Sequence, residues 1–339
     1  MDLPAANRKL AAGEDLTREE MQSVMTLIMS GEATDAQIGA FLIALMIKGE
    51  SVEEITGAAI IMADLAARVP TRAEKIVDCV GTGGDGAKLF NVSTASALVA
   101  AAAGASMAKH GNRAATGNSG AADVLEAAGV NITITPEQVG QCIDQCGIGF
   151  MFAPTHHSAM RFAIGPRKEI GVRSVFNLLG PLTNPAGAKY QLTGVFSQDW
   201  CRPMAETYAA LGSVHTLVAS SDDGLDEISI AAETLIVEYR DGAFSEYRIS
   251  PEQFGISRSD LSAVTVESSF QSLELIKSAL GGATGPAYDM VALNAGATIY
   301  AADLAATLED GVESARAILD SGKGLEKLDQ LVTVSSSFD

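Results

Sequence analysis

The sequence predicts an α/β protein: a small all-helical domain and a larger α/β domain with a mostly parallel central sheet. Residues 1–70 carry repeated helix start and stop signals and no strand pattern. From residue 75 onwards, short apolar strands alternate with helices, as in a parallel sheet. The 339 residues are enough for about two domains, each with its own core.

Residues 1–70 contain signals for the starts and ends of several helices. Capping boxes, in which a Ser or Thr precedes Glu or Gln by three positions, occur at Thr17-Arg18-Glu19-Glu20, Thr34-Asp35-Ala36-Gln37 and Ser51-Val52-Glu53-Glu54. Gly31 and Gly49 stand where helix ends are expected, and Pro70 is expected to end the last helix. Surplus apolar surface on these helices would serve either a subunit interface or ordinary internal packing.

The second part alternates between the two kinds of element. Strands are predicted at 76–80, 106–109, 148–152, 190–196 and 215–219, and helices at 95–104, 119–128 and 200–211. Thr135-Pro136-Glu137-Gln138 caps a further helix that begins at Pro136. Residues 234–240 and 243–249 flank Asp241-Gly242, a strong two-residue turn signal, and so predict a hairpin. Residues 269–332 return to helices.

One segment interrupts this alternation. Residues from His157 to Pro185 are rich in Arg, Pro and Asn and lack a strand period. We expect the segment to return to the helical part. The predicted helical domain is therefore 1–70 with approximately 158–186, and the predicted α/β domain is 75–157 with approximately 187–339. A cleft between them would hold the site.

Composition narrows the classes of function. The chain has 23 Lys and Arg against 42 Asp and Glu, a net charge of −19, which argues against a nucleic-acid partner. Its apolar runs are too short to span a membrane, and its first residues lack a secretion signal, so we expect a cytoplasmic protein. Four Cys do not make a disulfide framework, and Cys142 and Cys146 are expected to be buried on a helix.

A Gly-rich turn is the sharpest feature. Gly81-Thr82-Gly83-Gly84-Asp85-Gly86 follows the first strand, and Asn91-Val92-Ser93-Thr94 opens the next helix. Glycines let backbone N–H groups approach an anion, and a helix start offers further N–H groups. The two segments together predict a phosphate site. The alternative is that the second segment only caps its helix.

Three further clusters could carry chemistry. Lys109-His110-Gly111-Asn112-Arg113 ends a strand and suits a phosphorylated ligand, unless it is a solvated basic turn. Asp222-Asp223-Gly224-Leu225-Asp226-Glu227 suits Mg²⁺, unless it is a solvated acidic turn. His156 and His157, with Arg161, Arg167, Lys168 and Arg173 downstream, favour a pocket for a carboxylate. No Cys or third His stands at zinc-ligand spacing.

These motifs, in this order, closely resemble the anthranilate phosphoribosyltransferase family of tryptophan biosynthesis. The resemblance also includes Phe176-Asn177-Leu178-Leu179-Gly180-Pro181-Leu182-Thr183-Asn184-Pro185 and Leu293-Asn294-Ala295-Gly296, and it spans nearly the whole chain. It implies a small helical domain, a larger α/β domain and a homodimer joined by the helical parts. It also implies Mg²⁺ as the cofactor.

The resemblance assigns roles to residues of this chain. Residues expected at the phosphoribosyl diphosphate are Gly81, Gly84, Asp85, Leu89, Asn91, Val92, Ser93, Thr94, Lys109, His110, Gly111, Asn112, Arg113, Ala114, Ala115, Thr116, Gly117 and Ala121. Residues expected at anthranilate are Gly81, Asn112, His157 and Arg167, and those expected at the metal are Ser93, Asp226 and Glu227. No single residue is assigned as a catalytic acid, base or nucleophile.

The implied reaction moves the phosphoribosyl group of 5-phosphoribosyl 1-diphosphate onto the amine of anthranilate and releases pyrophosphate. The chain departs from the family pattern at Leu89, Thr116-Gly117, Ala121 and Ser158, where Thr, Ser-Ser, often Ser, and Pro are usual. None of these departures removes a charge or a metal ligand. The rivals are a pyrimidine nucleoside phosphorylase, a non-catalytic relative that binds nucleic acid, and a structural oligomer-forming protein.

Overall fold

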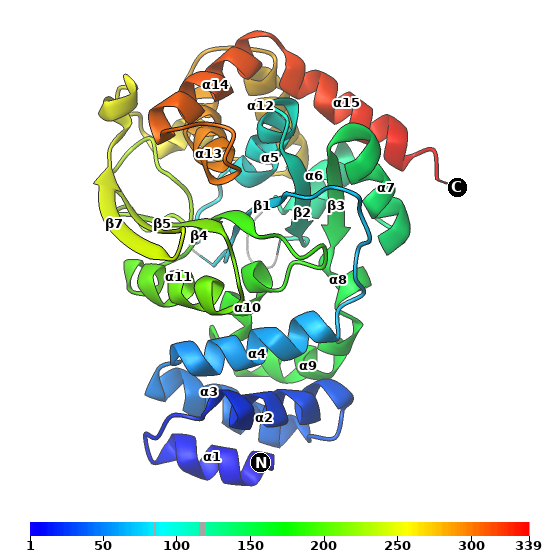
Figure 1. Ribbon diagram of the computed structural model, residues 1–339, viewed down its shortest axis with the longest axis vertical. Helices are drawn as coiled ribbons and strands as arrows, with labels where there is room; N and C mark the ends of the chain where they lie inside the picture. Colours follow the sequence, from blue (N-terminus) through cyan, green and yellow to red (C-terminus); the bar gives the residue numbers. More distant parts are fainter. Residues whose placement is uncertain (85, 115–118, 339) are drawn as a thin grey trace.

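The structure is a computed structural model that describes residues 1–84, 86–114 and 119–338. Four predicted diphosphate-binding residues, Asp85, Ala115, Thr116 and Gly117, lie outside the described residues. Figure 1 shows two parts, a helical part at the N-terminal end and a larger part built on a sheet. The predicted fold class is confirmed.

Helices are the commonest element of the described chain. They are α1 (Leu3–Ala11), α2 (Arg18–Ser30), α3 (Asp35–Lys48), α4 (Val52–Asp64), α5 (Val92–Ala102), α6 (Ala121–Ala127), α7 (Pro136–Cys146), α8 (Ala153–His156), α9 (Arg161–Ile170), α10 (Phe176–Leu182), α11 (Cys201–Ala210), α12 (Ser269–Leu280), α13 (Pro286–Ala301), α14 (Leu308–Asp320) and α15 (Lys323–Ser335). No helix of the described residues is both long and apolar enough to cross a membrane.

In the part of the chain that the structure describes, the sheet has seven strands in the order β3-β2-β1-β4-β5-β6-β7. They are β1 (Ile76–Gly81), β2 (Ser106–Gly111), β3 (Ile148–Phe152), β4 (Tyr190–Gly194), β5 (His215–Ser221), β6 (Thr234–Arg240) and β7 (Ala243–Ile249). Strands β1 to β5 run parallel, and β6 and β7 add an antiparallel hairpin at one edge. Asp241 and Gly242 both have positive φ, 52° and 81°, as this tight turn requires.

The capping signals place the helix starts of the small part. Thr17, Thr34 and Ser51 each accept a hydrogen bond from the backbone three residues on, in complete capping boxes. One such cap is worth about 1 kcal/mol. The prediction for the last helix was wrong, because α4 ends at Asp64 and residues 65–69, which are not helical, precede Pro70. That segment is tied down by backbone bonds, including Val69 N–H to the Pro185 carbonyl at 3.1 Å.

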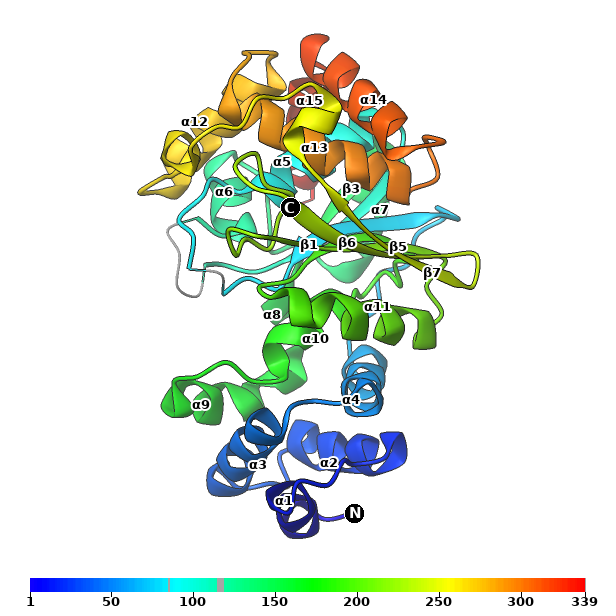
Figure 2. The same cartoon turned by 90° about the vertical axis from the view of Figure 1, so that its left-hand side faces the viewer.

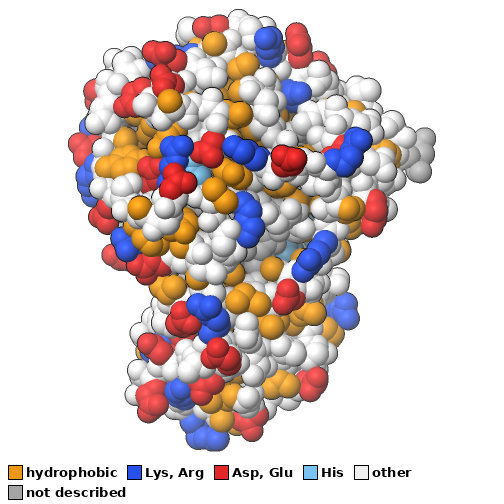
Figure 3. All heavy atoms as spheres, in the orientation of Figure 1, with side chains coloured by type: hydrophobic (Ala, Val, Ile, Leu, Met, Phe, Trp, Pro, Cys, Tyr) orange, Lys and Arg blue, Asp and Glu red, His pale blue; other side chains and the backbone are white. Residues whose placement is uncertain are grey.

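Two apolar clusters organise the packing. One lies between the sheet and α5, α7, α12, α13, α14 and α15, and the other joins α1 to α4, α9, α10 and α11 to the opposite face of the sheet. Figures 1 and 2 show these two layers on either side of the sheet. Helix α9 packs against α2 and α3 of the helical part. In the space-filling view the outline narrows between the two parts (Figure 3).

Candidate functional site

The carboxyl ends of the central strands meet at one edge of the sheet. Strands β1, β2 and β4 end in Gly81, Gly111 and Gly194, and β5 ends in Ser221. In parallel α/β sheets this edge, where the strand order reverses, is where ligands bind. Here the chain leaves β1 towards the Gly-rich loop and leaves β5 towards the acidic loop.

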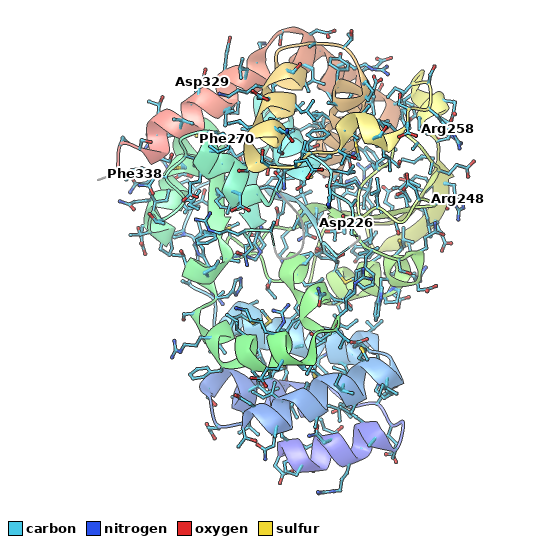
Figure 4. The ribbon with its side chains drawn as sticks, turned by 180° about the vertical axis from the view of Figure 1, so that it is seen from behind. Asp226, Arg248, Arg258, Phe270, Asp329 and Phe338 are labelled. Carbon is cyan, nitrogen blue, oxygen red and sulfur yellow. The ribbon has the colours of Figure 1, made fainter. Side chains whose placement is uncertain are left out.

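Asp226 packs against the start of the Gly-rich loop. Its Oδ2 accepts a hydrogen bond from Gly83 N–H at 2.6 Å, and Asp226 as a whole is only 8% exposed. A Cβ atom added to Gly81 would lie 2.2 Å from Asp226 Oδ2. One added to Gly194 would lie 1.5 Å from the Asp226 carbonyl oxygen. Glycine at these two positions is therefore what lets the carboxylate lie between the ends of β1 and β4. Figure 4 labels Asp226 at this central position.

The acidic loop has two unlike ends. Asp222 is exposed and accepts from Arg248 at 2.7 Å, and this guanidinium lowers the pKa of the Asp222 carboxyl. Asp223 accepts from the Ser229 hydroxyl at 2.6 Å and so shapes the loop. Only Asp226, which is buried, and Glu227, which is half-buried, lie at the Gly-rich side. The solvated-turn alternative therefore describes Asp222 but not Asp226.

The start of α5 combines capping with hydroxyls that have no partner. Asn91 Oδ1 accepts from Thr94 N–H at 3.0 Å, so the capping alternative holds for this side chain. The hydroxyls of Thr82, Thr94 and Ser119 are buried and have no hydrogen-bond partner among the described residues. Thr82 belongs to the Gly-rich loop, Thr94 to the first turn of α5, and the Ser119 carbonyl accepts from Asn91 Nδ2 at 3.4 Å. Buried hydroxyls almost always bond to something, so these three favour a polar ligand around the start of α5.

Lys109 is a buried cation beside the same helix start. It is 2% exposed, and its Nζ donates to the Cys79 carbonyl at 2.7 Å and to Ser93 Oγ at 3.1 Å. These two bonds leave at most one of its three N–H groups for a ligand. The structure thus brings together Lys109 and Ser93, which the sequence placed in one site from separate motifs.

Two histidines lie together beneath the end of β2. The rings of His110 and His157 are 5.1 Å apart between centroids, and His110 Nδ1 lies 3.2 Å from the Gly180 carbonyl. The Nε2 atoms of both rings are buried without a partner among the described residues. Arg167 on α9 stacks 5.0 Å from the Phe176 ring centroid, and burial lowers its pKa. The His156 ring instead bonds to the Ala67 carbonyl, with its Nδ1 2.9 Å away.

Other predicted residues occupy varied positions. Arg113 is exposed and forms ion pairs with Asp123 at 3.0 Å and Glu126 at 2.8 Å, so it lies on the surface of the basic turn. Leu89 forms an isolated bridge with Thr265. Four of the remaining predicted residues lie on the loops or at the end of β2. The Gly84 carbonyl accepts from Arg173, and Gly111 lies against Ala121. Asn112 accepts from the Arg113 N–H, Ala114 N–H donates to Asp123, and Val92 is buried in the first turn of α5.

The donor set fits Mg²⁺. The ion prefers oxygen ligands, keeps several waters and is usually held by one or two carboxylates together with substrate phosphates. Such oxygens are supplied at this edge by Asp226, which bonds to Gly83, by Glu227, whose charge acts on Cys79 of β1, and by the Ser93 hydroxyl, which accepts from Lys109. Among the described residues there is no group of three or more His, Cys, Asp or Glu side chains that could hold a metal alone.

The buried histidines make acid destabilise the fold. Burial, helped by the neighbouring imidazole, lowers the pKa of His110 to about 3 and that of His157 to about 4, from an ordinary value of 6.5. The unfolded chain therefore binds protons that the folded chain does not, and stability is lost as pH falls from 6.5 towards 4. We expect the free energy of unfolding to fall by a few kcal/mol over that range, which urea titrations at several pH values would show as a lower unfolding midpoint.

Replacing one ring tests this origin. In His110→Gln the midpoint should depend less steeply on pH between 6.5 and 4.5, because one proton uptake is removed. Asp78, whose pKa is raised to about 6, acts in the opposite direction in both proteins and does not change the difference. An unchanged pH slope in the variant would assign the acid sensitivity to other groups.

The structure also shows polar residues that the sequence motifs did not assign. Asp78, Asn184 and Asn294 are all buried and hydrogen-bonded. Asn294 on α13 accepts from Ile228 N–H and donates to the Ile228 carbonyl, both at 2.9 Å, and so holds the residue after Glu227. A polar residue inside an apolar stretch was the available signal for Asp78 and Asn294, whereas Asn184 stands between Thr183 and Pro185 without that signal.

Comparison with known proteins agrees with this geometry. Residues 4–66 match the helical bundle domain, and residues 73–325 the a/b domain, of a glycosyl transferase family. The anthranilate phosphoribosyltransferase of Ectopseudomonas mendocina is 55% identical, covering 100% of this chain and 98% of its own. That of Thioalkalivibrio sulfidiphilus is 54% identical, covering 99% and 100%.

Solved structures give the same result. The crystal structure of anthranilate phosphoribosyltransferase from Thermus thermophilus superposes with a TM-score of 0.93 at 42% identity, covering 98% of this chain and 99% of that one. The Saccharomyces cerevisiae enzyme in complex with PRPP and Mg gives a TM-score of 0.90 at 26% identity, covering 99% and 98%. On the fold, the strand-end geometry and these identities, the chain belongs to the anthranilate phosphoribosyltransferase family.

Proposed function

We propose that this protein transfers the phosphoribosyl group of 5-phosphoribosyl 1-diphosphate to the amine of anthranilate, releasing pyrophosphate, in tryptophan biosynthesis. The observation that carries the proposal is the meeting of the Gly-rich loop, the start of α5 and the Asp226–Glu227 pair at one sheet edge. This edge offers N–H donors, a cation and carboxylates within one small region, which suits a ligand with several phosphates and a divalent cation.

Binding of the diphosphate would use groups already described. Gly81, Gly84 and the first turn of α5 present backbone N–H groups, and Asn91, Ser93 and Thr94 present side-chain oxygens at the same place. Lys109 adds positive charge in a buried setting, where Coulomb interactions are stronger than in water. The remaining predicted diphosphate-binding residues, and the role of each one here, are part of the proposal.

The chemistry needs no covalent intermediate on the protein. As the bond from C1 of the ribose to the diphosphate oxygen breaks, positive charge grows on the sugar and negative charge on the leaving group. Donors fixed near that oxygen stabilise this charge without reorganising. Mg²⁺ bound by Asp226, Glu227 and Ser93 would neutralise part of the leaving group's charge. The amine of anthranilate then forms the new bond to C1 and loses its proton.

Anthranilate is proposed to bind between the two parts of the molecule. Its carboxylate needs a cation, and Arg167 on α9 lies beside Phe176, with the His110 and His157 rings at the end of β2. Asn112, on the loop after β2, could donate to the same carboxylate or orient the amine. This arrangement would bring the amine from the helical side to the sugar held at the sheet edge.

Arg167→Ala is expected to raise the KM for anthranilate far more than that for phosphoribosyl diphosphate. A charged hydrogen bond left unmade is worth roughly 1.5–3 kcal/mol, which corresponds to about tenfold or more. Steady-state kinetics with each substrate varied at saturation of the other measures the difference. Arg161→Ala serves as a matched control, because Arg161 lies at the other end of α9 and stacks on Phe162. Equal effects of Arg167→Ala on both substrates would mean that Arg167 acts through packing.

Product analysis separates the proposal from its main rival. The protein is incubated in parallel with anthranilate and phosphoribosyl diphosphate, and with thymidine or uridine and inorganic phosphate, each with Mg²⁺. We expect phosphoribosylanthranilate from the first mixture and no free base from the second. Free pyrimidine base would favour a nucleoside phosphorylase, and no product from either mixture would favour a non-catalytic relative.

Assembly, domain limits and location are also proposals. A homodimer through the helical part is supported by exposed apolar side chains there, including Ile47 at 76% and Val172 at 47% exposure. Light scattering on the intact protein measures the mass directly.

We propose that 158–186 belongs to the helical domain, as the packing of α9 against α3 suggests. A cytoplasmic location, without nucleic-acid or membrane partners, completes the proposal.

A further inference from the structure

Strands β1 and β2 separate before they end. Their ladder pairs only Ile76 with Ser106 and Val77 with Met107. The outer ladders continue: β1 pairs with β4 as far as Gly81, and β2 pairs with β3 as far as Gly111. The sheet is therefore open between β1 and β2 at the edge where the Gly-rich and basic loops begin.

Side chains replace the missing ladder on both sides of this opening. On β1, Cys79 N–H donates to Asp78 Oδ1 at 2.8 Å, and the Cys79 carbonyl accepts from Lys109 Nζ at 2.7 Å. On β2, His110 N–H donates to Asp78 Oδ1 at 3.3 Å. The Ala108 carbonyl accepts from Asn184 Nδ2 at 2.9 Å. Cys79, Ala108 and His110 are the residues whose backbone would have continued the ladder.

The three side chains form one connected group, which we name the wedge: Asp78, Lys109 and Asn184. Asn184 Nδ2 donates to Asp78 Oδ2 at 2.7 Å as well as to Ala108, and its own Oδ1 accepts from Ala186 N–H at 2.9 Å. All three residues are at most 9% exposed. Asn184 follows α10 and Lys109 bonds to Ser93 of α5, so the wedge is held from both faces of the sheet.

This arrangement is costly for the fold. Burial raises the pKa of the Asp78 carboxyl to about 6, although the positive charge of Lys109 opposes the shift. A plain β1–β2 ladder with apolar side chains would satisfy the same backbone groups without burying a carboxyl and an ammonium. The wedge is therefore not explained by stability, and the opening that it maintains calls for another reason.

We propose that the wedge holds β1 and β2 apart so that the loops after them stand at the spacing that phosphoribosyl diphosphate requires, which makes Asp78 and Asn184 positioning residues for the transfer. This inference rests on the proposed function. The diphosphate site draws on both loops, Gly81 to Gly84 after β1 and Gly111 to Ala114 after β2, and so spans the opening. Of the proposed anthranilate contacts, Arg167 lies on α9, and Asn112 and the His110 and His157 rings lie on the β2 side of the opening. None of these contacts spans the opening as the diphosphate site does, so anthranilate binding should depend less on its width.

Substitutions at the Asp78–Asn184 hydrogen bond test the wedge. In Asp78→Asn two amide N–H groups face each other, and in Asn184→Asp two carboxylates do. The double variant Asp78→Asn with Asn184→Asp restores one donor and one acceptor between these two side chains, while the Ala108 carbonyl still loses its amide donor, so partial recovery is expected. Each single change is expected to raise the KM for phosphoribosyl diphosphate at least about tenfold, with less than about threefold change for anthranilate. The double variant should recover at least about a third of the lost kcat/KM.

Controls separate positioning from a general loss of fold. Gln191 on β4 pairs in register with Asp78, is 3% exposed and holds Ser213 and Thr216, so it matches Asp78 in burial but lies away from the opening. Gln191→Leu should lower the melting temperature and leave both KM values near wild type. If Asp78→Asn does not fold, the milder variant Asn184→Ala tests the proposal instead. It too should raise the KM for phosphoribosyl diphosphate much more than the KM for anthranilate.

Wild-type turnover is established first, so failure of the proposed function is seen before any variant is assayed. Calorimetric binding of phosphoribosyl diphosphate with Mg²⁺ and without anthranilate gives a second readout, in which the single variants should bind at least about tenfold more weakly. Equal changes in both KM values, unchanged values, or a double variant no better than the singles would overturn the proposal.

Discussion

Replacing Asp226 by Asn together with Glu227 by Gln is expected to abolish nearly all turnover. The exchange keeps the size of both side chains and removes the two charges that the Mg²⁺ proposal requires. The amide introduced by Asp226→Asn would still offer an oxygen to Gly83 N–H, which donates to the native carboxylate at 2.6 Å, so the loop contact survives. Loss of charge stabilisation at the leaving group costs several kcal/mol of barrier, or about a thousandfold in rate.

Initial rates over a range of Mg²⁺ concentrations measure this effect. The wild-type rate should require Mg²⁺ and saturate, whereas the double variant should stay inactive at all concentrations. Asp222→Asn is the matched control, since Asp222 lies on the same loop but pairs with Arg248 on the surface. It should retain near wild-type rates. Unchanged turnover in the double variant would make the whole acidic loop a solvated surface.

The second large effect is expected from Gly194→Ala. The added Cβ would lie 1.5 Å from the carbonyl oxygen of Asp226 and 2.3 Å from its carbonyl carbon. These are backbone atoms, so a side-chain rotation cannot relieve the contact, and the segment carrying Asp226 and Glu227 must move. Overpacking of this kind costs about 1–3 kcal/mol of stability. We expect kcat/KM to fall about a hundredfold or more, because small misplacements of charged groups have large catalytic costs.

Thermal melts of the Gly194→Ala variant measure its loss of stability, and kinetics of the same preparation measure its loss of kcat/KM. Gly39→Ala is the control, because Gly39 lies inside α3 and its added Cβ would meet only Ile170 Cγ2 at an ordinary 3.7 Å. That variant should keep full activity. If Gly194→Ala also keeps full activity while folded, the close packing of the acidic loop against the end of β4 has no part in the reaction.

Local signals in the sequence predicted the elements well. The capping boxes at Thr17, Thr34 and Ser51 work through bonds three residues apart, so they are visible in the chain itself. The hairpin around Asp241-Gly242 matches the prediction at both strands, since its turn needs positive φ at two consecutive positions. Pro70 misled the prediction because a proline marks a place where a helix cannot continue, and α4 had already ended at Asp64.

The inner organisation of the site could not be predicted in this way. The contact of Gly194 with Asp226, and the bond of Asp78 with Asn184, join residues 32 and 106 positions apart. Neither follows a helical or strand period, because both arise only when separate strands and loops meet. A buried Asp within an apolar strand was visible at Asp78, yet its partners depend on the opening between β1 and β2. Tertiary contacts decide these positions.

Turnover of anthranilate by the intact protein tests the proposed transfer most directly. Anthranilate fluorescence is followed after phosphoribosyl diphosphate is added with Mg²⁺, and pyrophosphate is assayed in the same samples. We expect fluorescence to fall only when phosphoribosyl diphosphate and Mg²⁺ are both present, with one pyrophosphate released for each anthranilate consumed. Constant fluorescence, or pyrophosphate released without loss of anthranilate, would contradict it.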